Sequence, residues 1–220
     1  MPIRAVVFDM DGVLIDSEPL YNKADAVLFA SLGLPFGAEE IAAVTGVSHK
    51  VFGKWAKDRY RHLTQSEDEL SRLYAENLLS ALKTNDVAIE PGVLQWLARF
   101  QKQGVKLAIA SSSTSEMVGH IVERFGFGQY MEAVITGSDV DLGKPYPDIF
   151  LKAAQRLGVP PCDCLAVEDS TNGIKAALSA GMTCLAYTAT NRHGLDQSKA
   201  HLFCNRFDDA NWDACIAPLL

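Results

Sequence analysis

Short apolar runs alternate along the chain with stretches whose apolar residues recur at helical spacing. A helix is predicted over residues 114–125, and glycines at 126 and 158 follow helical stretches, which predicts helix C-caps. The apolar runs have the length and the flanking turn residues of strands, and they cover Ile3–Phe8, Val105–Ala110, Ala133–Thr136, Cys164–Val167 and Thr183–Tyr187. This alternation predicts a parallel β-sheet covered by helices on both faces.

One stretch, residues 17–89, breaks the alternation. Its apolar residues keep helical spacing, for example over residues 70–82, and no convincing strand interrupts them. We therefore predict an inserted helical domain over 17–89 and an α/β domain made of residues 1–16 and 90–220.

Composition and charge narrow the class of protein. Of the 220 residues, 48% are hydrophobic, and the net charge of −7 argues against nucleic acid as a partner. No apolar run approaches the ~18–20 residues of a membrane span, and the first residues do not resemble a signal peptide. The five cysteines are odd in number and lack metal-binding or redox spacing, so we predict buried, reduced, structural thiols and a cytoplasmic protein without an evident obligate protein partner.

Two acidic pairs stand where predicted strands end. Asp9 and Asp11 follow the first strand, and Glu168 and Asp169 follow the strand that begins at Cys164. Open α/β sheets place their ligands at this edge, so the two pairs are expected to share a divalent cation, and oxygen ligands favour Mg²⁺ over Zn²⁺. Taken alone, each pair is explained as well by a turn or a helix N-cap.

A third strand ends in serines, and a lysine precedes the next helical stretch. Ser111 and Ser112 stand at the start of the 114–125 helix, where hydroxyls and free backbone amides suit a phosphate group. Lys144, followed by Pro145, supplies a cation that can bind phosphate as a point charge. Separately, these residues are explained by helix capping and by an ordinary surface lysine.

Together and in this order, the motifs resemble those of the haloacid dehalogenase superfamily. The resemblance covers nearly the whole chain and implies a Rossmann-like α/β fold with a small inserted all-helical cap, similar to that of β-phosphoglucomutases, phosphoglycolate phosphatases and hexose-phosphate phosphatases. It rests on Phe8-Asp9-Met10-Asp11-Gly12-Val13-Leu14-Ile15-Asp16-Ser17-Glu18, Ser111, Gly143-Lys144-Pro145 and Glu168-Asp169-Ser170.

The resemblance implies a role for each matching residue. Asp9 would be the nucleophile, forming an aspartyl-phosphate, and Asp11 the general acid/base. Ser111 and Lys144 would bind the transferring phosphoryl group, with a further contact from Ser112.

The metal site implied by the resemblance holds Mg²⁺. Asp9 and Asp169 would bind the ion through their side chains, and Asp11 through its backbone carbonyl. Glu168 would either bind the ion directly or contact the residues that bind it. An acid at position 11 points to phosphate chemistry, because the dehalogenases of this superfamily typically lack it.

The cap is expected to select the substrate. Tyr21, Ser48 and His49 are its candidate substrate contacts, since the loop before His49 resembles a substrate-contacting cap loop. β-Phosphoglucomutases typically carry histidine and arginine where this chain has Tyr21 and His49, which disfavours the mutase. We therefore expect a magnesium-dependent phosphatase for a small phosphorylated metabolite, plausibly a sugar phosphate, with a phosphohexomutase or a phosphoglycolate phosphatase as alternatives.

Overall fold

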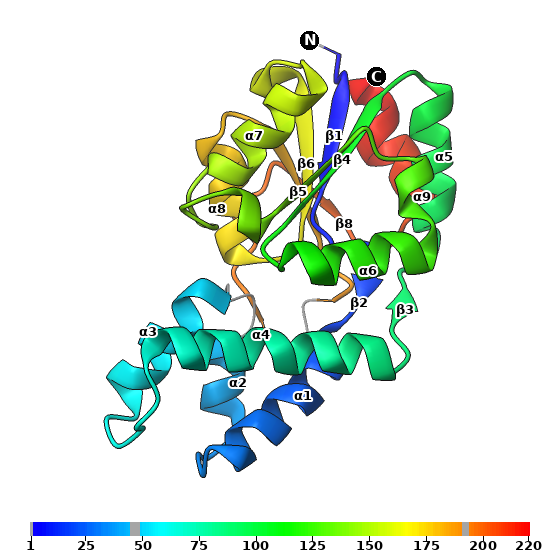
Figure 1. The fold of residues 1–220 in the computed structure, drawn as a ribbon. Coiled ribbons are helices and arrows are strands. Elements are labelled where there is room, and N and C mark those ends of the chain that lie inside the picture. The colour runs from blue at the N-terminus through cyan, green and yellow to red at the C-terminus, as the bar shows by residue number, and fades with distance from the viewer. Residues whose placement is uncertain (1, 45–48, 191–193) are drawn as a thin grey trace.

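The described part of the chain, residues 2–44, 49–190 and 194–220 of a computed structural model, contains a six-stranded parallel sheet (Figure 1). The strand order is β5-β4-β1-β6-β7-β8. The strands are β1 (Ala5–Phe8), β4 (Lys106–Ser111), β5 (Ala133–Thr136), β6 (Cys164–Glu168), β7 (Thr183–Tyr187) and β8 (Leu202–Cys204). The predicted parallel sheet is confirmed, and β8 is an additional short strand at its edge.

The first strand of the chain lies in the middle of the sheet. β1 pairs in parallel with β4 on one side and with β6 on the other, and Phe8 stands opposite Ile109 and Val167. The carboxyl ends of these strands therefore meet at one edge of the sheet, which is where the acidic and serine motifs follow.

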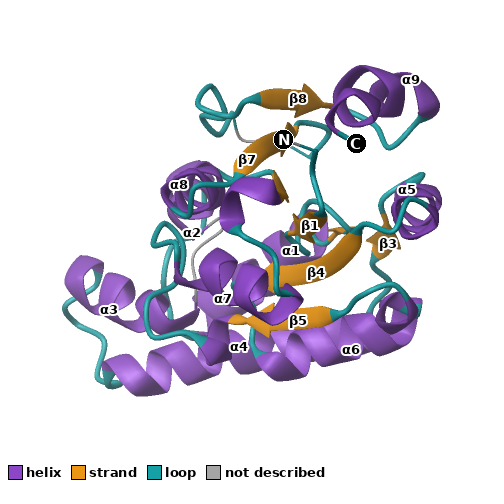
Figure 2. Ribbon diagram, turned by 90° about the horizontal axis from the view of Figure 1, so that it is seen from above, coloured by secondary structure: helices purple, strands orange, loops and turns teal. Residues whose placement is uncertain are grey.

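Helices cover both faces of the sheet, as predicted (Figure 2). These helices are α5 (Val93–Lys102), α6 (Ser115–Phe125), α7 (Asp148–Leu157), α8 (Thr171–Ser179) and α9 (Asp209–Asn211), followed by a π-helical turn at Trp212–Ile216. Alternate residues of β1 point to opposite faces, so Val6 and Phe8 pack with α5, α6 and the C-terminal helices, while Ala5 and Val7 pack with α7 and α8. Short 3-10 turns occupy Phe127–Gln129, Gly137–Asp139, Pro161–Asp163 and Ala217–Leu219.

Local signals fix the ends of several helices. Thr114 accepts a hydrogen bond from the Met117 N–H at the start of α6, and Gly126 ends that helix in the left-handed conformation with φ of 67°. Gly158 ends α7 in the same conformation, as its position in the sequence predicts.

Four helices form a cap across the carboxyl edge of the sheet (Figure 1). They are α1 (Glu18–Ser31), α2 (Ala38–Val44), α3 (His49–Arg59) and α4 (Glu67–Thr84). Inside the cap the rings of Phe52 and Tyr74 stack with centroids 4.1 Å apart, which ties α3 to α4.

The cap joins the sheet domain through two short strands that the sequence pattern did not predict. β2 (Ile15–Asp16) and β3 (Ala88–Ile89) pair antiparallel, with Ile15 opposite Ile89. β3 falls within the range predicted to be helical, because a two-residue strand carries no periodicity and exists only through its partner.

All five cysteines are free, and three of them are buried. Cys162 is exposed and Cys215 is partly exposed, so the prediction of five buried thiols is wrong for these two. Cys162 lies in a 3-10 turn that precedes β6, outside the sheet that buries Cys164.

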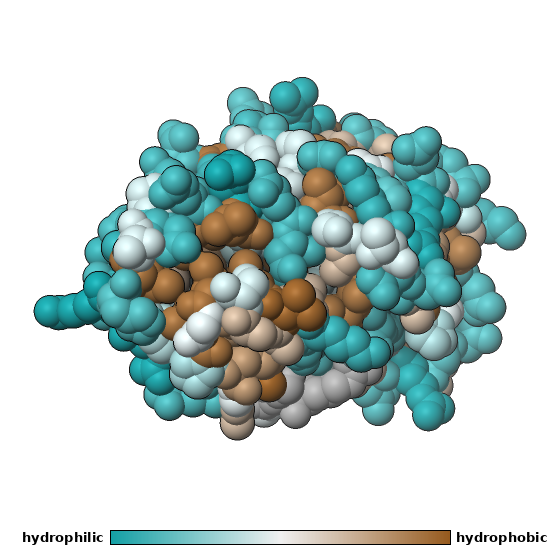
Figure 3. All heavy atoms as spheres, turned by 60° about the horizontal axis from the view of Figure 1, so that its bottom comes forward, coloured by the Kyte–Doolittle hydropathy of each residue, from teal (hydrophilic) through white to brown (hydrophobic). Residues whose placement is uncertain are grey.

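The cap face of the molecule combines hydrophilic and hydrophobic side chains (Figure 3). Val27 on α1 and Val51 on α3 are among the exposed large hydrophobic residues of the cap. Among the described helices none has the length and apolar character required to cross a membrane.

Candidate active site

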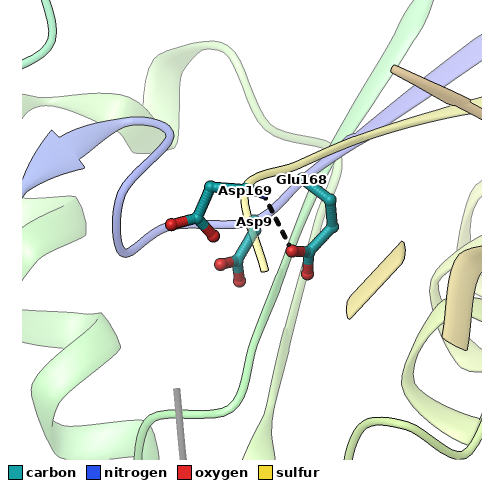
Figure 4. A group of neighbouring side chains, drawn as sticks. All are labelled: Asp9, Glu168 and Asp169. Atoms are coloured by element: carbon teal, nitrogen blue, oxygen red, sulfur yellow. Dashed lines mark hydrogen bonds between the residues drawn. The ribbon is translucent and has the colours of Figure 1, made fainter. Parts of the chain in front are cut away.

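Three carboxylates lie together at the carboxyl edge of the sheet (Figure 4). Asp9 follows β1 and is held in register by its backbone N–H, which donates to the Val167 carbonyl at 2.9 Å. Glu168 ends β6 and Asp169 follows it. One carboxylate oxygen from each of the three acids lies within 4.8 Å of the others, so the site brings together two acids from one predicted motif and one from the other.

Lys144 reaches into this group from the loop before α7. Its Nζ donates to Asp9 Oδ1 at 2.7 Å, to Glu168 Oε1 at 2.5 Å and to the Ala110 carbonyl at 3.0 Å. The lysine side chain is only 5% exposed, and the Lys144–Pro145 peptide bond is cis.

The three carboxylates of this group exceed the single positive charge of Lys144. Burial raises the pKa of Asp9 to about 7, although Lys144 opposes the shift. Burial, followed by repulsion from Glu168 and Asp9, raises the pKa of Asp169 well above its ordinary value. The candidate metal ligands are all carboxylate oxygen atoms, and only one ammonium group opposes their charge, so the site fits a hard divalent cation.

Glu168 is fixed from both sides. Its Oε2 accepts hydrogen bonds from the Asp169 N–H at 3.0 Å and from the Ser170 N–H and hydroxyl at 3.1 Å each, while Oε1 accepts from Lys144. Gly173 leaves the space for this carboxylate, because a Cβ atom there would overlap it. These bonds orient Glu168 toward Lys144 and the backbone at the start of α8.

Asp11 has different partners from Asp9. Its Oδ1 accepts from the Ser17 hydroxyl at 2.7 Å, and its Oδ2 accepts from the Ser113 hydroxyl at 2.9 Å and from the Ser111 hydroxyl at 3.5 Å. Hydroxyl groups, rather than a charged side chain, therefore hold this carboxylate.

The backbone after Asp11 turns tightly beside the candidate metal ligands. Gly12 has φ of 77°, and a Cβ atom on it would overlap the Asp169 carboxylate. Glycine at this position thus permits both the turn and the close approach of Asp169.

The cap and the sheet domain enclose a cavity of about 120 Å³ over this group. Its lining from the sheet domain includes Asp9, Asp11, Ser112, Ser113, Lys144 and Asp169. Ser111 is fully buried and is absent from the described lining, where Ser112 and Ser113 stand instead. The structure therefore places Ser112, of the two predicted serines, at the cavity wall.

The cap contributes both aromatic and polar groups to the cavity. Tyr21 and His49, two of the predicted substrate contacts, line it, and Ser48 lies outside the described residues. Burial, followed by the neighbouring Asp11, raises the pKa of Tyr21, so the phenol is neutral and can donate. Burial, followed by the charge of Lys50, lowers the pKa of His49.

Several residues of the site carry no sequence signal of their own. Ser17 lies within the quoted motif that begins at Phe8, and Ser113 follows the predicted Ser111 and Ser112, but neither was predicted to contact Asp11. Asp25 and Tyr74 of the cap line the same cavity, but each reads in sequence as an ordinary helix residue.

Comparison with known proteins identifies the family. Residues 3–181 match the family model of haloacid dehalogenase-like hydrolases. Hexitol phosphatase B of Escherichia coli K12 is 31% identical over 189 residues, covering 85% of this chain and 84% of the relative. A phosphorylated carbohydrates phosphatase of Thermotoga maritima is 31% identical over 207 residues, covering 91% and 90%.

A solved structure agrees with these relatives. CbbY from Rhodobacter sphaeroides, in complex with phosphate, superposes with a TM-score of 0.79 at 28% identity, covering 94% of this chain and 96% of that one. The chain therefore belongs to the haloacid dehalogenase-like hydrolases and is a phosphatase of that family.

Proposed function

We propose that the protein is a magnesium-dependent phosphatase that hydrolyses the phosphate monoester of a sugar or polyol through an aspartyl-phosphate on Asp9. The observation that carries this proposal is the contrast between two aspartates that line one cavity. Asp9 accepts a hydrogen bond from Lys144 and is one of the candidate metal ligands, whereas Asp11 accepts hydrogen bonds from serine hydroxyls.

Asp9 is suited to attack and Asp11 to proton transfer. In the first step an Asp9 carboxylate oxygen bonds to phosphorus, the bond to the leaving oxygen breaks, and protonated Asp11 gives its proton to that oxygen. In the second step Asp11 takes a proton from water, whose oxygen bonds to phosphorus and releases phosphate from Asp9. The Lys144 ammonium and the hydroxyl of Ser112 bind phosphoryl oxygens, with Ser111 behind them.

Asp9 and Asp169 are the proposed side-chain ligands of the magnesium ion, with the Asp11 backbone carbonyl as a third ligand. When bound, Mg²⁺ neutralises charge on the phosphoryl oxygens. Both oxygens of Glu168 already accept hydrogen bonds, which favours an orienting role for this residue over direct ligation.

The proposed substrate class rests on the relatives and on the cap. The two relatives are named as phosphatases of hexitols and of phosphorylated carbohydrates. Tyr21, Asn22 and His49 offer hydrogen-bonding groups where a hydroxylated leaving group would lie. The unpaired cysteines fit a cytoplasmic enzyme.

Phosphate release from a panel of phosphate esters tests the proposal. With Mg²⁺, the protein should release phosphate from hexose and hexitol phosphates, and Asp9→Asn should lose at least about 10³-fold in kcat while it keeps the wild-type circular dichroism spectrum. An active Asp9→Asn enzyme would refute the mechanism. Conversion of β-glucose 1-phosphate to glucose 6-phosphate without phosphate release, with a bisphosphate activator present, would make the protein a mutase.

A further inference from the structure

One buried acid of the cap has no hydrogen-bond partner among the described residues. Asp25 on α1 is 3% exposed and lines the cavity above the catalytic group. Its Oδ1 atom is buried and makes no hydrogen bond with any described residue. Burial raises its pKa to about 7. The carboxyl group thus lies at the cavity with hydrogen-bonding capacity that the described protein leaves unused.

The other buried acids of the described chain are bonded. Glu40 accepts from Arg59 and Tyr60, and Glu90 accepts from the Tyr187 hydroxyl at 2.7 Å. Lys144 bonds Asp9 and Glu168, and Arg4 pairs with Asp163. A buried carboxyl group without a partner costs free energy that an apolar residue would avoid, so structure alone does not account for Asp25.

The charge around Asp25 is negative. Lys144, the lysine among the described lining residues, is already bonded to Asp9 and Glu168. Burial, followed by the negative charge of Asp25, raises the pKa of Tyr74 well above its ordinary value, so Tyr74 is neutral. The ionisable groups that share the cavity with Asp25 are Asp9, Asp11, Glu18, Tyr21, His49, Tyr74, Lys144 and Asp169.

We propose that Asp25 determines specificity: it accepts a hydrogen bond from a hydroxyl of a neutral polyol or sugar leaving group and disfavours leaving groups that carry a carboxylate or a second phosphate. The inference rests on the proposed phosphatase function and deepens it. A hydroxyl supplies the donor that Asp25 lacks. An anionic leaving group would place like charges together inside the cavity, which weakens its binding.

The test compares two substrates, one with a neutral and one with an anionic leaving group, in the wild type and in Asp25→Asn. Sorbitol 6-phosphate has a neutral leaving group with hydroxyls, and phosphoglycolate has an anionic one. The wild type should have the higher kcat/KM for sorbitol 6-phosphate. Asp25→Asn, which removes the charge at nearly constant shape, should shift the ratio of the two values toward phosphoglycolate by about tenfold or more.

A matched control and a stability measurement separate specificity from structure. Asp58→Asn changes an exposed aspartate of the same cap, on α3, and should leave the ratio unchanged. Asp25→Asn should also raise Tm at pH 8, above the Asp25 pKa of about 7, because it removes an unpartnered buried charge, so a shift in specificity would come with a more stable protein.

Each outcome decides the inference. A shift of the ratio toward phosphoglycolate of less than about tenfold overturns it, as does a wild type that prefers phosphoglycolate, a result that does not require the variant to fold. If the wild type releases phosphate from neither substrate nor from any other monoester, the proposed function itself fails. Asp25→Ser serves as a second variant if Asp25→Asn does not fold, with the same direction of shift expected.

Discussion

At the scale of single residues, two aspartates on one strand end differ through their surroundings. Asp9 continues the line of β1 and is bonded by the Lys144 ammonium, whereas Asp11 follows two residues later and is bonded by Ser17 and Ser113. The ammonium group of Lys144 opposes the rise in the pKa of Asp9 that burial causes, and so favours the nucleophilic carboxylate. Asp11 is bonded by hydroxyl groups and has no such charged partner among the described residues. The proposed division of labour thus follows from local contacts.

Asp25 also predicts how stability depends on pH. Its pKa is about 7 in the folded protein and 3.8 in the reference state, so between about pH 4 and pH 7 the folded state binds more protons than the unfolded state. The contribution of Asp25 to stability therefore falls as pH rises through this range. Measured by thermal unfolding, the gain in Tm from Asp25→Asn should be larger at pH 8 than at pH 5; an equal gain at both values contradicts the shift.

Gly173 predicts a second residue-scale effect. Gly173→Ala would force the Glu168 carboxylate away from Lys144 and Ser170, so we expect a loss of kcat and a loss of about 1–3 kcal/mol in unfolding free energy. Gly119→Ala is the matched control, since Gly119 also lies in a helix but faces open space, and it should stabilise by about 0.5–1 kcal/mol. Urea unfolding and steady-state kinetics measure both. Equal effects of the two substitutions would contradict the packing argument.

At the scale of elements, the position of the cap depends on how α4 ends. Arg124 of α6 donates to the backbone carbonyls of Leu82 and Asn85 and to Asp86 Oδ1 at 2.8 Å. The guanidinium group thus binds the carboxyl end of α4, where carbonyls lack helical partners, and joins it to the sheet domain. Lys50 adds a second link by donating to the Val140 carbonyl at 2.7 Å.

Arg124→Met should therefore weaken the attachment of the cap. We expect a loss of about 1–2 kcal/mol in unfolding free energy, from hydrogen bonds to a charged donor, together with a raised KM. Arg72→Met removes an exposed pair with Glu76 on the outside of α4 and should cost less than about 0.5 kcal/mol. Urea unfolding of both variants makes the comparison, and a larger effect at Arg72 would show that α4 is not held in this way.

At the scale of the whole molecule, the acidic group predicts a link between metal binding and stability. Mg²⁺ at about 100 times its Kd should stabilise the fold by about 2.7 kcal/mol, or about 5–10 °C in Tm, relative to the protein in EDTA. Asp169→Asn should lose most of this difference because it removes a proposed ligand. Scanning calorimetry with and without Mg²⁺ measures it, and an unchanged Tm in the wild type would argue against a divalent cation at this site.

The sequence predicts the sheet well because its inner strands are buried on both faces. Continuous apolar runs mark β4 to β7 to within about a residue, for example Val105–Ala110 against the observed Lys106–Ser111. β8 is only three residues long, so its apolar run Leu202–Cys204 is too short to be recognised as a strand. β2 and β3 exist through pairing across more than 70 residues, which no local pattern encodes.

The candidate site is predictable to the extent that it follows the strand ends. Asp9, Glu168 and Lys144 come together because parallel strands finish at one edge. Asp25 could not be found in this way, since a single aspartate on a helix is usually solvated and only the packing of α1 shows it to be buried. Which serine reaches the cavity likewise depends on the turn after β4.

The central place of β1 has a consequence for biosynthesis. β1 leaves the ribosome first, yet its partners β4 and β6 begin at residues 106 and 164. At about 5–20 residues per second, the second partner follows roughly 8–30 seconds later. During that interval the apolar Ala-Val-Val-Phe segment lacks at least one of its two neighbours, and the cap helices are made before the sheet can close. The nascent chain must therefore keep its central strand from aggregation until β6 has been synthesised.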